Sequence, residues 1–297
     1  MTTEDIPTTS GLADFVVDGK TYQTFYIIYG DLRNLGKRRP LVGLHGGPGF
    51  SHHYMIIPVV LYDQIGNGAS SHIRDAPTEF WTLELFMNEL ENLLKHLGIQ
   101  DNFDLLGHSW GGMLASAYAS IRIPSGLHRL IIANSPASGP LMMQGFNDLL
   151  DLLPGNAAEI VRSNEAAGTL QDLDYQKTLE VFQKKHICAL DPWPQGLVDS
   201  FEEYKKDQTV YLALWGTLEF QLTGNLKDWS IIPSLAQISV PTLLLSSPQD
   251  EIQPVAYMPF FEHIPKVKWV DIPGCSHVAM YEAPDRYFDA LISFLNV

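Results

Sequence analysis

The chain has 297 residues, of which 45% are hydrophobic and 18% are charged. These values are typical of a globular protein with a large buried core, and the length suits a single α/β domain that carries an insertion. The formal net charge of −15 argues against binding to nucleic acids or to anionic membrane surfaces, because both of these partners are themselves negative.

Neither a membrane segment nor a secretion signal is visible in the sequence. No apolar run approaches the roughly 18 residues that span a bilayer, and acidic residues stand where a signal peptide has its basic start. Cys188 and Cys275 lie far apart and lack the spacing of a metal site, so we expect free thiols in a reducing compartment. These features predict a cytoplasmic protein without a membrane partner.

Strand-like and helical runs alternate along most of the chain. Two β-rich runs within residues 13–29 flank Asp18 and Gly19, a dipeptide that tight primed turns favour, so the chain begins with a hairpin. The other expected elements are strands over 40–44 and 58–64, a helix over 82–97, a strand before 107 with a helix over 113–119, strands over 130–134, 240–246 and 267–272, and a helix over 285–295. Such alternation indicates an α/β protein with a doubly wound, mostly parallel sheet.

The pattern changes in the middle of the chain, where strand-like runs vanish. The helical stretches expected there cover residues 141–153, 157–168, 174–187 and 198–214. We therefore predict that residues 1–135 and 233–297 form the α/β core, and that residues 136–232 form an inserted helical cap.

A nucleophile motif stands at the centre of the sequence. Ser109 lies in G-H-S-W-G (residues 107–111), directly after an apolar strand and directly before a small-residue helix. A sharp strand-to-helix turn exposes the serine hydroxyl to a base, and it brings strand and helix so close that only glycine fits at Gly107 and Gly111. This context favours a catalytic serine over a chance occurrence of the motif in a loop.

A glycine-rich turn, H-G-G-P-G over residues 45–49, follows the strand at 40–44. Glycines leave backbone N–H groups uncovered by side chains, which suits one half of an oxyanion hole. Alone, the turn could also be an ordinary loop. The nucleophile motif downstream favours the functional interpretation.

An acid and a histidine complete a candidate triad. Asp250 follows the strand over 240–246, and His277 follows the last strand, which gives the chain order of α/β-hydrolase triads. Asp250 would orient His277, and His277 would deprotonate Ser109. Taken singly, Asp250 could be a turn aspartate and His277 a surface histidine. The remaining histidines form no metal signature, and neither a P-loop nor a dinucleotide fingerprint is present, so we expect no metal and no cofactor.

Several segments together resemble one known family, the proline iminopeptidases. The segments are residues 45–49 (H-G-G-P-G), 62–64 (Y-D-Q), 107–112 (G-H-S-W-G-G), 250–251 (D-E) and 274–277 (G-C-S-H). The family consists of aminopeptidases with the α/β-hydrolase fold and a helical cap, and the resemblance runs over nearly the whole chain. It implies that the N–H groups of Gly47 and Trp110 hold the oxyanion.

The resemblance also implies a subsite for the free α-ammonium group of the substrate. Glu251, directly after the triad aspartate, and Glu219, in a cap segment similar to the family's N-G-P-x-E-F stretch, would hold this group. Charge-assisted hydrogen bonds of this kind contribute roughly 1.5–3 kcal/mol each, so two carboxylates would reject an acylated amine. From the residues alone, each glutamate could also be a solvated acid.

Two departures from the family stand out. Residues 215–217 are W-G-T where relatives have N-G-P, which could reshape the pocket beneath Glu219. The connection between the strands at 40–44 and 58–64 is also shorter than a parallel crossover with a helix requires. Either the chain has lost this helix, or its sequence omits a segment between about Tyr54 and Ile57. We favour the omission, because a deletion would leave the sheet uncovered.

We therefore predict a serine aminopeptidase that releases N-terminal residues, proline by preference, from short peptides, or hydrolyses amino-acid amides and arylamides. The alternative is an esterase, lactonase or thioesterase that acts on a small metabolite, since the fold tolerates this change. A third hypothesis is a non-catalytic α/β hydrolase that binds a small molecule. The oligomeric state does not follow from the sequence.

Overall fold

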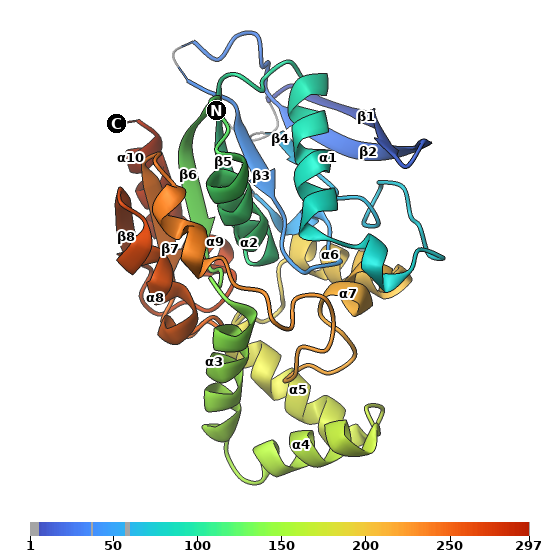
Figure 1. The fold of residues 1–297 in the computed structure, drawn as a ribbon. Coiled ribbons are helices and arrows are strands. Elements are labelled where there is room, and N and C mark those ends of the chain that lie inside the picture. Colours follow the sequence, from blue (N-terminus) through green and yellow to red (C-terminus); the bar gives the residue numbers. More distant parts are fainter. Residues whose placement is uncertain (1–5, 37, 57–59, 297) are drawn as a thin grey trace.

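The computed structural model describes residues 6–36, 38–56 and 60–296, and a single sheet runs through this part of the chain (Figure 1). The strands are β1 (Thr8–Val17), β2 (Lys20–Tyr29), β3 (Leu41–Leu44), β4 (Val60–Tyr62), β5 (Phe103–His108), β6 (Leu127–Ala133), β7 (Thr242–Ser246) and β8 (Val267–Asp271). Their spatial order is β1-β2-β4-β3-β5-β6-β7-β8. β1, β2 and β4 pair antiparallel, and from β4 to β8 every pair is parallel, as predicted.

The first two strands form the predicted hairpin. Val17 pairs with Lys20, so the turn consists of Asp18 and Gly19 alone. Both residues have a positive φ, 50° and 77°, which is the geometry of a primed two-residue turn. Aspartate and glycine tolerate this left-handed conformation better than most residues, which explains the dipeptide.

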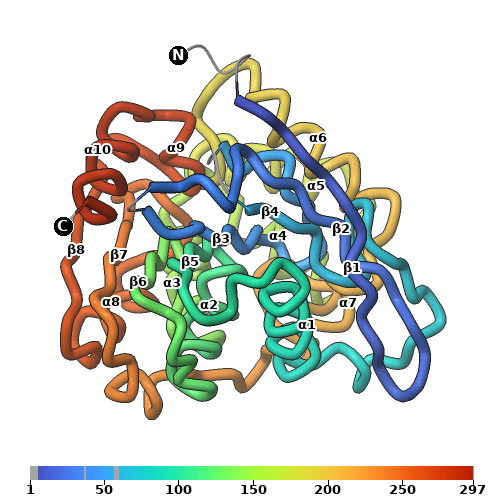
Figure 2. The backbone as a smooth tube through the Cα atoms, turned by 90° about the horizontal axis from the view of Figure 1, so that it is seen from above, coloured from blue at the N-terminus to red at the C-terminus, as the bar shows by residue number. Residues whose placement is uncertain are grey.

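Helices lie on both faces of the sheet (Figure 2). The core helices are α1 (Leu83–His96), α2 (Trp110–Ala117), α8 (Pro254–His263), α9 (Ala279–Glu282) and α10 (Pro284–Leu295). Figure 2 shows α1, α2 and α8 on one side of the sheet, and α9 and α10 on the other. Successive strand residues supply the two faces in turn. Leu105 of β5 packs in the first of the two apolar clusters, whereas Leu106 packs in the second.

Between β6 and β7 the chain is mostly helical, with an irregular segment over residues 215–231. The helices are α3 (Gly139–Asp151), α4 (Ala157–Ala167), α5 (Leu173–His186), α6 (Gln195–Lys206) and α7 (Thr209–Leu214), followed by the 3₁₀ helix η5 (Ile232–Gln237). Figure 1 shows α3, α4 and α5 grouped beyond one end of the sheet.

One of the predicted helices in this region is wrong in its extent. The single helix predicted over 198–214 is divided into α6 and α7, because Asp207 adopts an extended conformation between them. Its Oδ1 accepts hydrogen bonds from the backbone N–H and the hydroxyl of Thr209, at 3.0 and 2.6 Å. Asp207 therefore satisfies the N–H of the first residue of α7 and ends the longer helical run.

The short crossover joins β3 to β4. Within residues 45–56 the regular element is the 3₁₀ helix η2 (His52–Tyr54), and this described stretch contains no α-helix. Tyr54 and Met55 are buried in the second apolar cluster, so they cover part of the sheet face that a crossover helix would occupy. Residues 57–59 lie outside the described residues. The prediction of a missing segment between about Tyr54 and Ile57 therefore stays a prediction.

The close approach of α2 to β3 generates a test of the fold. A Cβ at Gly111 would overlap the backbone carbonyl oxygen of Leu44, and neither backbone can move without distorting the sheet. We expect Gly111→Ala to lower the free energy of unfolding by about 3 kcal/mol, the upper range for overpacking. Urea denaturation measures this loss.

Gly98→Ala is the matched control. Gly98 has a φ of 68°, and the space that an added Cβ would occupy is open, so alanine there meets backbone strain but no overlap. The expected cost is about 1 kcal/mol. Equal effects of the two substitutions would contradict the close approach.

Candidate active site

Ser109 stands at the junction of β5 and α2. Its φ of 56° and ψ of −124° lie in a region that non-glycine residues rarely adopt, and this turn projects the side chain from the sheet edge. Gly107 on one side permits contact with Gly111 of α2, and the Cβ of Ser109 lies against Gly46. Ser109, His277 and Glu251 line the same cavity, which has a volume of about 60 Å³.

Asp250 and His277 form a buried hydrogen-bonded pair. The His277 Nδ1–H donates to Asp250 Oδ1 at 2.7 Å. The same oxygen accepts from the backbone N–H of Ile252, and Oδ2 accepts from the side-chain amide of Asn134 at 2.8 Å. Asn134 follows β6, has a φ of 50° and was not identified from the sequence. With both oxygens engaged, the aspartate is held in one orientation toward the histidine.

The electrostatic environment of His277 is unusual. Burial alone would lower the pKa of this histidine, but Asp250 and the carboxylate of Glu251 outweigh burial and raise it to about 9. The His277 Nε2 and Glu251 Oε1 atoms are 3.9 Å apart. Burial in turn raises the pKa of Glu251 to about 7, with the charge of His277 acting in the opposite direction. The protonation state of His277 therefore depends on that of Glu251, and the reverse.

The two predicted oxyanion donors lie at the ends of the elements that flank Ser109. Gly47 follows β3 and has a φ of 115°, and Trp110 is the first residue of α2. Among the described residues, no acceptor is bonded to the backbone N–H of either Gly47 or Trp110. Both donors are therefore free to bind a ligand oxygen, and the start of α2 adds the positive end of a helix dipole.

A hydrogen-bond network connects the motifs of the sequence. The indole N–H of Trp110 donates to Gln64 Oε1 at 2.8 Å, and the backbone N–H of Gln64 donates to His45 Nε2 at 3.0 Å. His45 Nδ1–H then donates to the carbonyl of Gly46. Burial lowers the pKa of His45 to about 4, so the ring is neutral and keeps this tautomer. The network locks the glycine-rich turn to α2.

A second relay runs through Tyr54 and His108. The Gly46 N–H donates to the Tyr54 hydroxyl at 2.6 Å, and this hydroxyl donates to His108 Nδ1 at 2.8 Å. His108 Nε2–H donates to the carbonyl of His277 at 2.9 Å. The glycine-rich turn, the nucleophile turn and the histidine loop are thus joined by successive hydrogen bonds. His108, buried inside the nucleophile motif, has this connecting role.

Glu219 lies after α7 in an irregular segment. Its two carboxylate oxygens accept from the hydroxyl of Tyr211 at 3.2 and 3.1 Å, and burial raises the pKa of Glu219 to about 6. The charge of Glu219 also contributes to the raised pKa of Glu251, and Tyr211 feels the charge of both glutamates. The structure therefore brings the two predicted glutamates into one electrostatic group beside His277.

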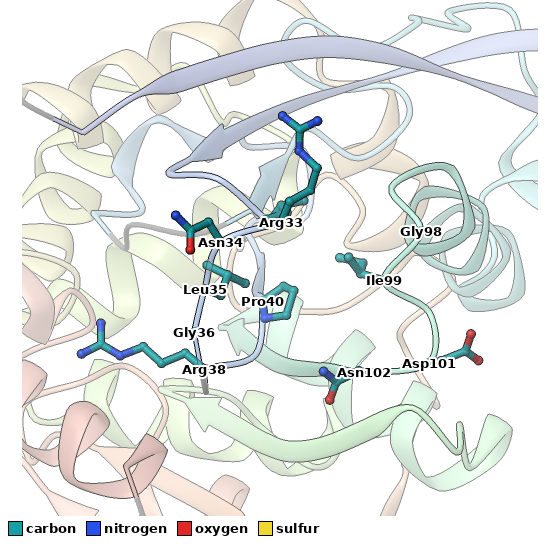
Figure 3. Close-up of a pocket in the computed structure, with 11 residues that line it drawn as sticks. Arg33, Asn34, Leu35, Gly36, Arg38, Pro40, Gly98, Ile99, Asp101 and Asn102 are labelled. Atoms are coloured by element: carbon teal, nitrogen blue, oxygen red, sulfur yellow. The ribbon is translucent and has the colours of Figure 1, made fainter.

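A larger pocket of about 430 Å³ lies elsewhere, at the amino ends of β3 and β5 (Figure 3). Arg33, Arg38 and Asp101 are drawn there with their charged ends pointing in different directions, away from a common centre. A binding site for a small molecule normally has polar groups that converge. The smaller cavity at Ser109 meets this condition, whereas the larger pocket does not.

Comparison with known proteins places the chain in a family. The alpha/beta hydrolase fold family matches residues 39–284. The proline iminopeptidase of Lactobacillus helveticus (strain DPC 4571) is 33% identical over 297 residues, an alignment that covers 95% of this chain and 98% of that relative. The chain belongs to the proline iminopeptidase family of α/β hydrolases. The predicted family and fold class are confirmed.

Solved structures agree with this membership. The crystal structure of VinJ matches with a TM-score of 0.91 and 38% identity, covering 98% of this chain and 99% of that one. The proline iminopeptidase of Mycobacterium smegmatis matches with a TM-score of 0.87 and 34% identity, covering 97% and 98%. Both similarities extend over the core and the helical insertion alike. Within the described residues, no helix combines the length and the apolar character needed to cross a bilayer.

The pairing of His277 with Glu251 yields a prediction. Glu251→Gln removes a negative charge 3.9 Å from Nε2, so the imidazolium loses stabilisation and the pKa of His277 falls. We expect a decrease of about one unit, the lower end for a charge at this distance. A proton NMR titration, with the His277→Asn spectrum to assign the resonance, measures this shift.

Glu262→Gln serves as the control, because Glu262 is an exposed residue on α8. It should leave the pKa of His277 unchanged. An unchanged pKa in Glu251→Gln as well would contradict the coupling of the two groups.

Proposed function

We propose that the protein is a serine aminopeptidase that releases N-terminal residues, proline by preference, from short peptides, or hydrolyses amino-acid amides and arylamides. One observation carries the proposal: the carboxylates of Glu251 and Glu219 form a largely buried group beside the hydrogen-bonded Asp250 and His277. His277 is the cation beside Glu251, whereas the partner of the Glu219 carboxylate among the described residues is the neutral hydroxyl of Tyr211. A substrate ammonium would supply a second positive charge to this group. The names of the relatives from Lactobacillus helveticus and Mycobacterium smegmatis agree with this activity.

In the proposed mechanism, the hydroxyl of Ser109 attacks the substrate carbonyl as His277 accepts its proton. The N–H groups of Gly47 and Trp110 stabilise the oxyanion of the tetrahedral intermediate. His277 then donates the proton to the leaving amine, and the acyl-enzyme remains on Ser109. Water, activated by the same histidine, hydrolyses the acyl-enzyme. The buried contacts of Asp250 support its role in orienting the imidazole.

The substrate's own charge would assist the base. With the subsite empty, Glu251 helps to hold His277 protonated, since this carboxylate contributes to the raised pKa of about 9. An ammonium group bound to Glu251 neutralises that carboxylate, so the pKa of His277 decreases and the imidazole can accept the proton of Ser109. An acylated amine carries no charge and would leave His277 protonated. Discrimination would then act on catalysis as well as on binding.

The helical insertion would limit the size of the substrate. We propose that residues 136–232 act as a cap domain on the core formed by residues 1–135 and 233–297. The backbone N–H of His277 donates to the carbonyl of His186 at 3.1 Å, and that of Val278 donates to Ile187 at 3.2 Å. These contacts support a cap that is joined directly to the catalytic loop and encloses the N-terminal residue of a substrate.

The first test compares substrates that differ at the amine. We expect hydrolysis of prolyl-arylamide, and slower hydrolysis of alanyl-arylamide, with N-acetyl-prolyl-arylamide at least about 100-fold slower. Two lost charge-assisted hydrogen bonds amount to roughly 3 kcal/mol or more, which corresponds to this ratio. Release of the chromophore measures each rate, with Ser109→Ala as the blank. Hydrolysis of p-nitrophenyl acetate alone would favour the esterase alternative.

The two glutamates are tested by charge removal. Glu219→Gln and Glu251→Gln should each raise KM for prolyl-arylamide by about tenfold, as expected when one charge-assisted bond becomes a neutral one. Hydrolysis of p-nitrophenyl acetate, which has no ammonium group, should persist in both variants. Equal losses on the two substrates would show that the glutamates do not select the amine.

A further inference from the structure

A third buried carboxylate lies behind the proposed amine subsite. Glu165 belongs to α4, and the residue is 5% exposed. Its Oε1 accepts from the backbone N–H of Glu219 at 3.0 Å, from that of Phe220 at 3.1 Å and from the hydroxyl of Tyr175 at 3.3 Å. Glu165 was not identified from the sequence, and it has no part in the proposed chemistry at Ser109.

Two of these three bonds hold a segment that has no regular secondary structure. Glu219 and Phe220 follow α7, where no helix or strand fixes the backbone. Glu165 therefore supplies the acceptor that a helix or sheet would otherwise provide for two successive N–H groups. Tyr175 of α5 donates to the same oxygen, so α4 and α5 together support the backbone of Glu219.

A single carboxylate oxygen with three donors is also a strong constraint on position. A buried acceptor of this kind loses favourable energy if any donor moves away, because no water replaces the lost bond. The side chain of Glu219 has one further support, the hydroxyl of Tyr211. The backbone of Glu219 is thus fixed by Glu165, and its carboxylate is fixed by Tyr211.

We propose that Glu165 is a positioning residue of the amine subsite, which holds Glu219 where its carboxylate meets the substrate's ammonium group. This inference rests on the proposed aminopeptidase function. Glu165 itself does not touch the substrate in this proposal. It acts through the backbone of Glu219 and through its own negative charge behind the subsite.

The charge of Glu165 has a measurable consequence. Burial is the main cause of the raised pKa of Glu219, and the charge of Glu165 raises it further. The other titratable groups that interact with Glu219 are Tyr175, Tyr204, Tyr211 and Glu251. The tyrosines remain neutral near pH 7, because burial raises the pKa of each. Glu165 is therefore the negative charge that raises the pKa of Glu219, and Glu219 in turn raises the pKa of Glu251.

Two substitutions at Glu165 separate its effect on the position of Glu219 from the effect of its negative charge. Glu165→Ala removes the acceptor and the charge together, and we expect KM for prolyl-arylamide to rise about tenfold or more while kcat/KM for p-nitrophenyl acetate changes less than about twofold. Glu165→Gln keeps an oxygen acceptor and removes the charge. It should retain a KM close to that of the unsubstituted protein near pH 8, because Glu219 stays in place.

The pH profile reports the charge. Glu219 binds an ammonium group only when it is ionised, so 1/KM rises as the pH rises through its pKa. Removal of the negative charge of Glu165 lowers that pKa. The acidic limb of 1/KM in Glu165→Gln should therefore move to lower pH. Glu159→Gln, at an exposed position of the same helix, should move neither the limb nor KM.

The outcomes distinguish the inference from the function on which it rests. If the unsubstituted protein hydrolyses p-nitrophenyl acetate but refuses prolyl-arylamide, both proposals are overturned. If it hydrolyses the arylamide and Glu165→Ala leaves KM unchanged, or lowers both activities equally, the positioning role alone is overturned. Should Glu165→Ala fail to fold, as thermal melting would show, the acidic limb of Glu165→Gln decides, and an unmoved limb overturns the role.

Discussion

The backbone turn at Ser109 is the constraint on which the rest of the site depends. A non-glycine residue with a φ of 56° and a ψ of −124° carries strain, and strain persists only where the surroundings leave no alternative. Here the surroundings are backbone. The absence of a Cβ at Gly107 lets α2 approach β5, and its absence at Gly111 lets β3 approach α2. Gly46 leaves room for the side chain of Ser109. The serine is therefore held by contacts that no side-chain rearrangement can relax.

The same contacts place the glycine-rich turn, which carries one predicted oxyanion donor, beside the start of α2, which carries the other. α2 is pressed against the end of β3, so the N–H of Trp110 and the turn that follows β3 must lie side by side. The network through Gln64 and His45 then fixes the turn relative to α2, and the relay through Tyr54 and His108 connects it to the loop of His277. Motifs that are far apart in the sequence become one rigid unit in this way.

Local patterns in the sequence predict those elements whose conformation is determined by neighbouring residues. The turn at Asp18 and Gly19, the periodic helix α1 and the strand-turn-helix around Ser109 all follow from neighbouring residues. The helix α8 was not predicted, because it is apolar on most sides and contains Pro259, so its sequence has no helical period. The division at Asp207 depends on one side chain that bonds to Thr209 at the start of α7, which a period averaged over the stretch does not detect.

Site residues that act through contacts with distant parts of the chain could not be predicted from the sequence. Asp250 and His277 are predicted because chain order carries the information. Asn134, at the end of a distant strand, bonds to Asp250. Glu165, on another helix, bonds to Glu219. The residues that flank these positions in the sequence give no sign of either contact. A buried polar partner that is distant in sequence becomes visible only when the fold brings the two together.

The buried carboxylates around His277 affect both the ionisation of the proposed subsite and its selectivity for a free amine. Asp250, Glu251, Glu219 and Glu165 place several carboxylates in one buried region, and His277 is the cation that interacts with two of them. Burial raises the pKa of Glu251 and of Glu219, so the charged form of the empty subsite is disfavoured. In the proposed function, a bound ammonium would offset this by supplying a second positive charge beside His277. If the subsite binds a free amine as proposed, that cation stabilises the ionised carboxylates, whereas an acylated amine brings no charge and leaves them unstabilised.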